Sequence, residues 1–87
     1  MTVYVLSSYY VNVDTGEESN EIIGVYGSYD KAFGRMTKEI PEIRKDFDYC
    51  DTEEHDFVDG DMCWEIWEKE LYFSHHCNLI IYEKEII

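Results

Sequence analysis

A block of like charge constrains this chain more than any other feature of its sequence. Between Asp46 and Glu68 the chain carries ten carboxylates and no Lys or Arg, which is half of its twenty acidic residues. Like charges held close together repel one another and destabilise a compact state. This segment must therefore lie at the surface, facing either solvent or a cationic partner, and it indicates binding rather than catalysis.

Composition narrows the class of protein. Seven Lys and Arg against twenty Asp and Glu give a net charge of −13. Coulomb repulsion at this charge disfavours direct binding to nucleic acid or to a membrane, and it favours a basic protein as the partner. The chain is also 45% hydrophobic and 16% aromatic, which is enough apolar surface to offset the entropy cost of folding. We expect residues 1–87 to fold as a single domain.

Two further features indicate the compartment. Residues 1–4 lack the basic start of a signal peptide, and no apolar run is long enough to span a membrane. The number of cysteines is odd, and Cys50, Cys63 and Cys77 fit reduced thiols better than a disulfide framework. We therefore expect a cytoplasmic protein.

The periodicity of apolar residues predicts an α+β fold. β-Branched and aromatic residues predict strands over Thr2–Val13, Glu21–Tyr26, Met62–Phe73 and Cys77–Ile87. Turn residues at 14–17 predict a hairpin between the first two strands, and residues 74–76 fit a connection before the last one. The order β-β-α-β-β implies one antiparallel sheet of about four strands with a helix packed on one face.

The helix is expected between the two pairs of strands. Ser28 can accept hydrogen bonds from the amides of a helix start, and an apolar stripe then runs at helical spacing from Tyr29 to Ile40. Pro41 is expected to interrupt this helix, because proline lacks the amide that a helix interior needs. A further helical turn can begin at the proline itself.

Residues Asp46 to Asp61 show no sustained period and are predicted to form an acidic loop. Such a long loop in a small domain is usually either functional or partly disordered, and we expect this one to carry the binding surface. Its carboxylates would attract a basic partner, and nearby aromatic rings would supply apolar anchors. The candidate partner-binding residues are Asp46, Asp48, Tyr49, Asp51, Glu53, Glu54, Asp56, Phe57, Asp59, Asp61, Glu65 and Trp67.

The tryptophans lie on opposite faces of their predicted strand. Trp64, Ile66 and Leu79 are expected to pack in the core. Trp67 fits either a second small core or an interface anchor, and the alternation alone does not choose between them.

The sequence contains no motif typical of catalysis. It has no nucleophile elbow, no phosphate-binding glycine loop and no H-E-x-x-H pair. His76 and Cys77 are adjacent, but sequence neighbours rarely form a catalytic pair and no third orienting group is evident. We therefore expect no catalytic residue and no enzyme.

The potential metal ligands also lack a diagnostic spacing. The acidic segment holds fragments of a calcium loop at the wrong offsets. The cysteines and His55, His75 and His76 form neither a C-x2-C knuckle nor an H-x3-H pair. We expect no metal and no cofactor, with buried thiols and solvent-exposed histidines, although spacing alone leaves open whether these residues bind a metal ion.

The chain resembles two groups of small proteins. Its size, its pI near 4.3, its aromatic content and the acidic residues Asp46–Asp61 are similar to those of phage-encoded inhibitors that imitate DNA, such as anti-restriction and anti-CRISPR proteins. The stretches VYVLSSYY at 3–10 and IIGVYGSYDKA at 22–32 resemble uncharacterised small phage and bacterial domains. The first resemblance implies an inhibitor that acts in the host cytoplasm, and the second implies no function.

The leading hypothesis is a DNA mimic, in which the acidic residues occupy the basic nucleic-acid-binding surface of a host defence protein. The alternative is a small structural or regulatory interaction module, including a homodimer, whose acidity serves only solubility.

Overall fold

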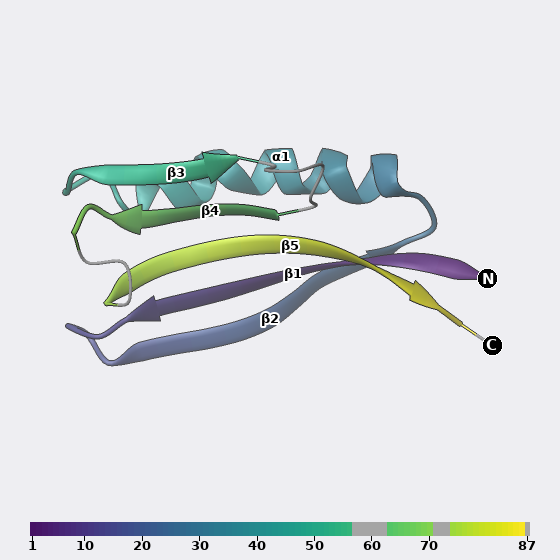
Figure 1. Ribbon diagram of the computed structural model, residues 1–87, viewed down its shortest axis with the longest axis horizontal. Coiled ribbons are helices and arrows are strands. Elements are labelled where there is room, and N and C mark those ends of the chain that lie inside the picture. The colour runs from purple at the N-terminus through teal and green to yellow at the C-terminus, as the bar shows by residue number, and fades with distance from the viewer. Residues whose placement is uncertain (57–62, 71–73, 87) are drawn as a thin grey trace.

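The computed structural model describes residues 1–56, 63–70 and 74–86, and it forms one antiparallel sheet with a helix on one face (Figure 1). The sheet has five strands in the order β2-β1-β5-β4-β3. The predicted α+β class is confirmed, whereas the predicted count of about four strands is wrong. The elements are β1 Thr2–Asn12, β2 Glu17–Tyr26, α1 Tyr29–Lys45, β3 Thr52–Asp56, β4 Cys63–Glu68 and β5 His75–Glu85.

The additional strand, β3, lies inside the segment predicted to be a loop. It pairs antiparallel with β4 from Thr52↔Glu68 to Asp56↔Trp64 and forms one edge of the sheet. Its sequence, TEEHD, has no apolar alternation, because an exposed edge strand buries little surface of its own. Strand β3 is therefore defined by its backbone pairing with β4. Residues 57–61 of the predicted loop lie outside the described residues.

The last strand, β5, is central rather than terminal in the sheet. It pairs with β1 along its whole length and with β4 between His76 and Ile80. The prediction that residues 74–76 form a connection is wrong for His75 and His76, which begin the strand opposite Asn12 and Val11. Beyond Ile80, β1 is the one strand among the described residues that pairs with β5, so the charged second half of β5 lies at a local edge of the described sheet.

The fourth strand, β4, is shorter than its predicted range. It ends at Glu68, where the turn residues Lys69 and Glu70 follow. Met62 and residues 71–73 of the predicted range lie outside the described part of the chain.

The helix begins as predicted and continues further. Ser28 is the N-cap, and its side chain accepts a hydrogen bond from the amide of Lys31 at 3.3 Å. Pro41 lies inside α1, so the predicted interruption is wrong. Ile40 is buried and Ile43 packs against the core from the next turn, so the burial of both turns on the sheet outweighs the hydrogen bond that proline removes.

The hydrophobic core lies between α1 and one face of the sheet. Trp64, Ile66 and Leu79 belong to it, as predicted from the alternation of their strands. Its buried members are Leu6, Ala32, Met36, Ile40, Phe47, Trp64, Ile66, Cys77, Leu79 and Ile81. No helix among the described residues is both long and apolar enough to cross a membrane.

The other face of the sheet is not covered by any described element and is here called the open face. Direct cross-strand partners share a face, so Val25, Val5 and Tyr82 form one row across β2, β1 and β5. Ile22 lies in the neighbouring row. Ile22, Val25 and Tyr82 are 66%, 57% and 43% exposed.

Candidate functional site

Acidic side chains from three chain segments gather at one end of the sheet. The β1–β2 turn lies there, together with the segment from the end of α1 to the start of β3 and with the end of β4 and the start of β5, opposite the two chain termini (Figure 1). The backbone amide of Lys69 donates to the carbonyl of Asp51 at 2.8 Å, which joins two of these segments. We call this set the acidic end, and it comprises Asp14, Glu17, Asp46, Asp48, Asp51, Glu68 and Glu70.

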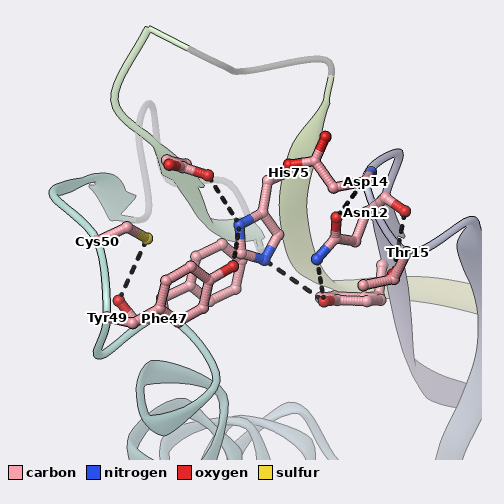
Figure 2. A network of polar contacts seen from close by, with 9 residues as sticks. Asn12, Asp14, Thr15, Phe47, Tyr49, Cys50 and His75 are labelled. Atoms are coloured by element: carbon pink, nitrogen blue, oxygen red, sulfur yellow. Dashed lines mark hydrogen bonds and ion pairs between the residues drawn. The ribbon is translucent and has the colours of Figure 1, made fainter.

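A buried histidine lies at the centre of the acidic end. The side chain of His75 is only 2% exposed. Its Nδ1 lies 3.2 Å from a carboxylate oxygen of Glu68 and 3.1 Å from the hydroxyl of Tyr49, and its Nε2 lies 3.4 Å from the hydroxyl of Tyr10 (Figure 2). The side-chain amide of Asn12 donates to the same Tyr10 hydroxyl at 3.4 Å. Both ring nitrogens of His75 are therefore held by polar side chains.

Aromatic rings fix the orientation of this imidazole. Phe47 is buried and stacks on His75, with ring centroids 4.1 Å apart and planes 14° apart. Tyr10 meets the imidazole edge-on at 5.9 Å, whereas Tyr49 lies parallel to it at 5.8 Å. Tyr49 is itself 70% exposed, whereas the imidazole beside it is buried.

A thiol and a hollow lie next to this histidine. The Sγ of Cys50 donates to the backbone carbonyl of Phe47 at 3.4 Å (Figure 2). It lies within 4.8 Å of a ring nitrogen of His75. A hollow of about 660 Å³ opens there, and it is lined by Asp48, Tyr49, Cys50, Asp51, Glu68, Lys69 and Glu70. Burial raises the pKa of the Cys50 thiol, and the negative charges of Glu68 and Asp51 raise it further. The pKa of Tyr49 is also raised, mainly by burial and further by the charges of the neighbouring Cys50 and Glu68 side chains.

A second polar cluster lies on the open face. One oxygen of the Glu65 carboxylate is 3.0 Å from Nε2 of His76, and the other is 3.3 Å from Nδ1 of His55. Trp67 packs edge-on against His55 at 5.0 Å and is 9% exposed. His75 and His76, which are adjacent in β5, therefore belong to two different clusters on opposite faces of the sheet. The expectation of solvent-exposed histidines is wrong for both of them, because each is buried.

The predicted partner-binding residues divide among three surfaces. Asp46, Asp48, Tyr49 and Asp51 lie at the acidic end. The pairing of β3 with β4 places Glu53, Glu65 and Trp67 on the open face.

Glu54 points to the helix side of the sheet. It forms an ion pair with Arg44 at 2.8 Å and accepts a hydrogen bond from the indole of Trp64 at 3.2 Å. Asp56 is placed by its backbone pairing at the end of β3, and Phe57, Asp59 and Asp61 lie outside the described residues.

Sequence reasoning did not group the residues around His75. Cys50, Glu68 and His75 come from a turn, the end of β4 and the start of β5, so only the sheet pairing brings them together. The one local signal is the alternation of β5, which extends back through His75 to place it on the core face with Cys77 and Leu79.

The candidate functional site is therefore an acidic end built around a buried histidine, a thiol and a hollow. Comparisons of the chain with protein-family models, with curated proteins and with solved structures find no match.

Proposed function

We propose that this protein binds the basic, nucleic-acid-binding surface of another protein and competes there with DNA. The observation that carries the proposal is the separation of charge over the molecule. Helix α1 holds Lys31, Arg35, Lys38, Arg44 and Lys45, which are five of the seven basic residues. The sheet and its turns therefore carry most of the carboxylates with few opposing charges. In keeping with the resemblance to phage inhibitors, the proposed partner is a host defence protein that grips nucleic acid.

The size and charge of the molecule suit this role. The chain extends 42 × 23 × 21 Å. A B-DNA segment of the same length carries about 25 phosphate charges, at one charge per about 1.7 Å. The protein has twenty acidic residues over that length. With its seven basic residues the net charge is −13, which is about half the linear charge density of DNA. Five of those basic residues lie on α1, so the sheet side of the molecule is the side that comes nearest to DNA in charge.

The carboxylates differ in how available they are to a partner. Asp46, Asp48, Asp51 and Glu53 are exposed. Glu54 and Glu65 are already engaged within the protein, by Arg44 and Trp64 and by two histidines. We propose that Asp46, Asp48, Asp51 and Glu53 contact the partner, while Glu54 and Glu65 stabilise the local structure through their bonds within the protein.

The test is affinity capture with a variant in which the four proposed contact carboxylates are replaced by uncharged amides. The variant replaces Asp46, Asp48 and Asp51 with Asn and Glu53 with Gln. A control variant removes the same number of charges elsewhere, with Glu18, Glu21, Glu42 and Glu83 changed to Gln. Wild-type and control protein should retain a nucleic-acid-binding protein from bacterial lysate, duplex DNA should displace it, and the first variant should not retain it. Equal retention by both variants, or retention that DNA does not affect, would contradict the proposal.

The open face favours a second candidate function, a self-assembling interaction module. Exposed apolar side chains that adjoin one another on a sheet face are typical of an interface. Val25 and Tyr82 are exposed on either side of the buried Val5 in one row, and the exposed Ile22 lies in the next row. In this role the acidity would serve only solubility.

Sedimentation at several concentrations distinguishes the two functions. For a homodimer, dilution should lower the apparent mass, and Ile22→Lys with Val25→Lys should give a monomer at every concentration. Neutralising Asp46, Asp48, Asp51 and Glu53 should leave that assembly intact. A wild-type mass that stays monomeric at high concentration would contradict the homodimer.

A further inference from the structure

We propose that Cys50, Glu68 and His75 form a binding site for a divalent metal ion of the zinc class. One potential ligand atom from each residue, the Cys50 Sγ, a Glu68 carboxylate oxygen and a His75 ring nitrogen, lies within 4.8 Å of the other two. This is the one such group among the residues that the structure describes. The proposal does not depend on the charge-driven binding proposed above, because its three ligands are not among the four carboxylates assigned to the partner.

The ligand set fits zinc by its chemistry. Thiolate, imidazole and carboxylate are the three side-chain types that zinc prefers, whereas calcium and magnesium prefer oxygen alone. A tetrahedral zinc ion with bonds of about 2.0–2.3 Å holds its ligand atoms about 3.3–3.8 Å apart. Nδ1 of His75 and the Glu68 oxygen are already 3.2 Å apart. The Cys50 sulfur needs a shift of only about 1 Å to complete the set, by the same geometry.

The contacts of His75 orient its Nδ1 so that it can bind a metal ion. A ligating histidine normally donates its other ring N–H to a protein acceptor, which fixes the tautomer and the ring orientation. Here Nε2 lies 3.4 Å from the hydroxyl of Tyr10, and Phe47 stacks on the ring at 4.1 Å. If Nε2 carries the proton, Nδ1 is an acceptor that lies 3.1 Å from the hydroxyl of Tyr49 and 3.2 Å from the carboxylate of Glu68. Two acceptors at 3.2 Å require a cation between them, either a proton or a metal ion.

The site is accessible and lies in a negative environment. Cys50 and Glu68 line the hollow of about 660 Å³ at the acidic end. Asp48, Asp51 and Glu70 line the same hollow against the single cation Lys69, so the local potential concentrates cations. Three protein ligands would leave one position of a tetrahedral ion for a water molecule or a group of a partner. This open position is the arrangement of a reactive zinc site rather than of a closed structural one.

Metal titration of the full chain tests the site. Zinc chloride is titrated into the reduced protein by calorimetry, and cobalt chloride is used as a spectroscopic probe because a cobalt–thiolate bond gives a charge-transfer absorption. We expect one tightly bound ion per chain, a thiolate–cobalt band, and loss of that band when zinc is added. Cys50→Ser should remove the band and weaken zinc binding by about 100-fold or more, and Glu68→Gln should weaken it by at least about tenfold.

Two matched variants serve as controls. Cys63→Ser removes a thiol that the pairing of β4 with Ile80 places on the open face, and Glu70→Gln removes a carboxylate from the same hollow. Both should bind zinc like the wild type, and circular dichroism should show that all variants fold. Absence of stoichiometric binding would overturn the site. Binding that is unchanged in Cys50→Ser would also overturn it, since the ions would then be held only by surface carboxylates.

Discussion

At the scale of single residues, Glu54 supports the fold as well as the surface charge. Its carboxylate accepts a hydrogen bond from the indole of Trp64, which is 1% exposed. Glu54→Ala leaves that buried N–H without its acceptor and should lower the free energy of unfolding by about 1–3 kcal/mol. Glu54→Gln keeps an acceptor oxygen and loses only a partly exposed ion pair with Arg44, so it should cost under about 1 kcal/mol. Urea unfolding measures both values, and equal losses would contradict this role of Glu54.

The buried thiol of Cys77 makes stability depend on pH in the alkaline range. Burial raises the pKa of Cys77 from 9.0 to about 12, and the negative charge of Asp46 adds to the rise. A raised pKa in the folded state favours the neutral thiol there. This contribution to stability is complete below the unfolded pKa of 9.0 and is lost as the pH rises toward about 12.

A Cys77→Ala variant isolates this effect. It loses packing at every pH but has no thiol to ionise. Its free energy of unfolding should therefore fall less steeply than that of the wild type between the two pKa values. Urea unfolding at several alkaline pH values provides the comparison, and parallel curves for the two proteins would show that Cys77 does not contribute.

At the scale of elements, the stability of α1 is lowered by a glycine in its interior. Gly34 lies in the exposed middle of the helix, and an added Cβ would meet nothing within 4 Å. Gly34→Ala should raise the free energy of unfolding by about 1 kcal/mol, because alanine loses less backbone entropy in a helix. The melting temperature should rise by about 4–8 °C. Gly16→Ala is the opposite control, since φ at Gly16 is +76° and it should destabilise. No increase for Gly34→Ala would contradict the expectation.

The elements that could be predicted from the sequence are those with an apolar period of their own. Strand β1 and the first turns of α1 bury a regular set of side chains, so pattern and propensity agree there. Strand β3 has no such pattern, because its backbone bonds to β4 define it. Helix α1 continues past Pro41 because Ile40 and Ile43 pack against the sheet. This tertiary packing cannot be predicted from the local preference of proline for helix ends.

The site was predictable only where it depends on composition. The surface position of Asp46, Asp48 and Asp51 follows from charge alone. The grouping of Cys50, Glu68 and His75 follows from sheet order, and the order β2-β1-β5-β4-β3 is not encoded in any spacing along the chain. The same sheet order places His75 and His76 on two different faces.

At the scale of the whole molecule, the uneven distribution of charge is the property on which the proposed function depends. Five basic residues lie on α1, of which Arg44 and Lys45 are in its last turn, next to the acidic end. The acidic end itself combines carboxylates from the β1–β2 turn, the segment after α1 and the end of β4. Electrostatic steering would bring a basic surface to this end first and would weaken as salt screens it. A partner that recognises DNA would then contact Asp46, Asp48, Asp51 and Glu53.

Competition with DNA tests the central claim most directly. Labelled duplex DNA is bound to the captured partner, and fluorescence anisotropy follows its release as the protein is added. We expect wild-type protein and the variant neutralised at Glu18, Glu21, Glu42 and Glu83 to release the DNA at similar concentrations. The variant neutralised at Asp46, Asp48, Asp51 and Glu53 should need about 10- to 100-fold more, because each lost contact contributes up to about 1 kcal/mol. Release of DNA at the same concentration by all three proteins, or no release by the wild type, would contradict DNA mimicry.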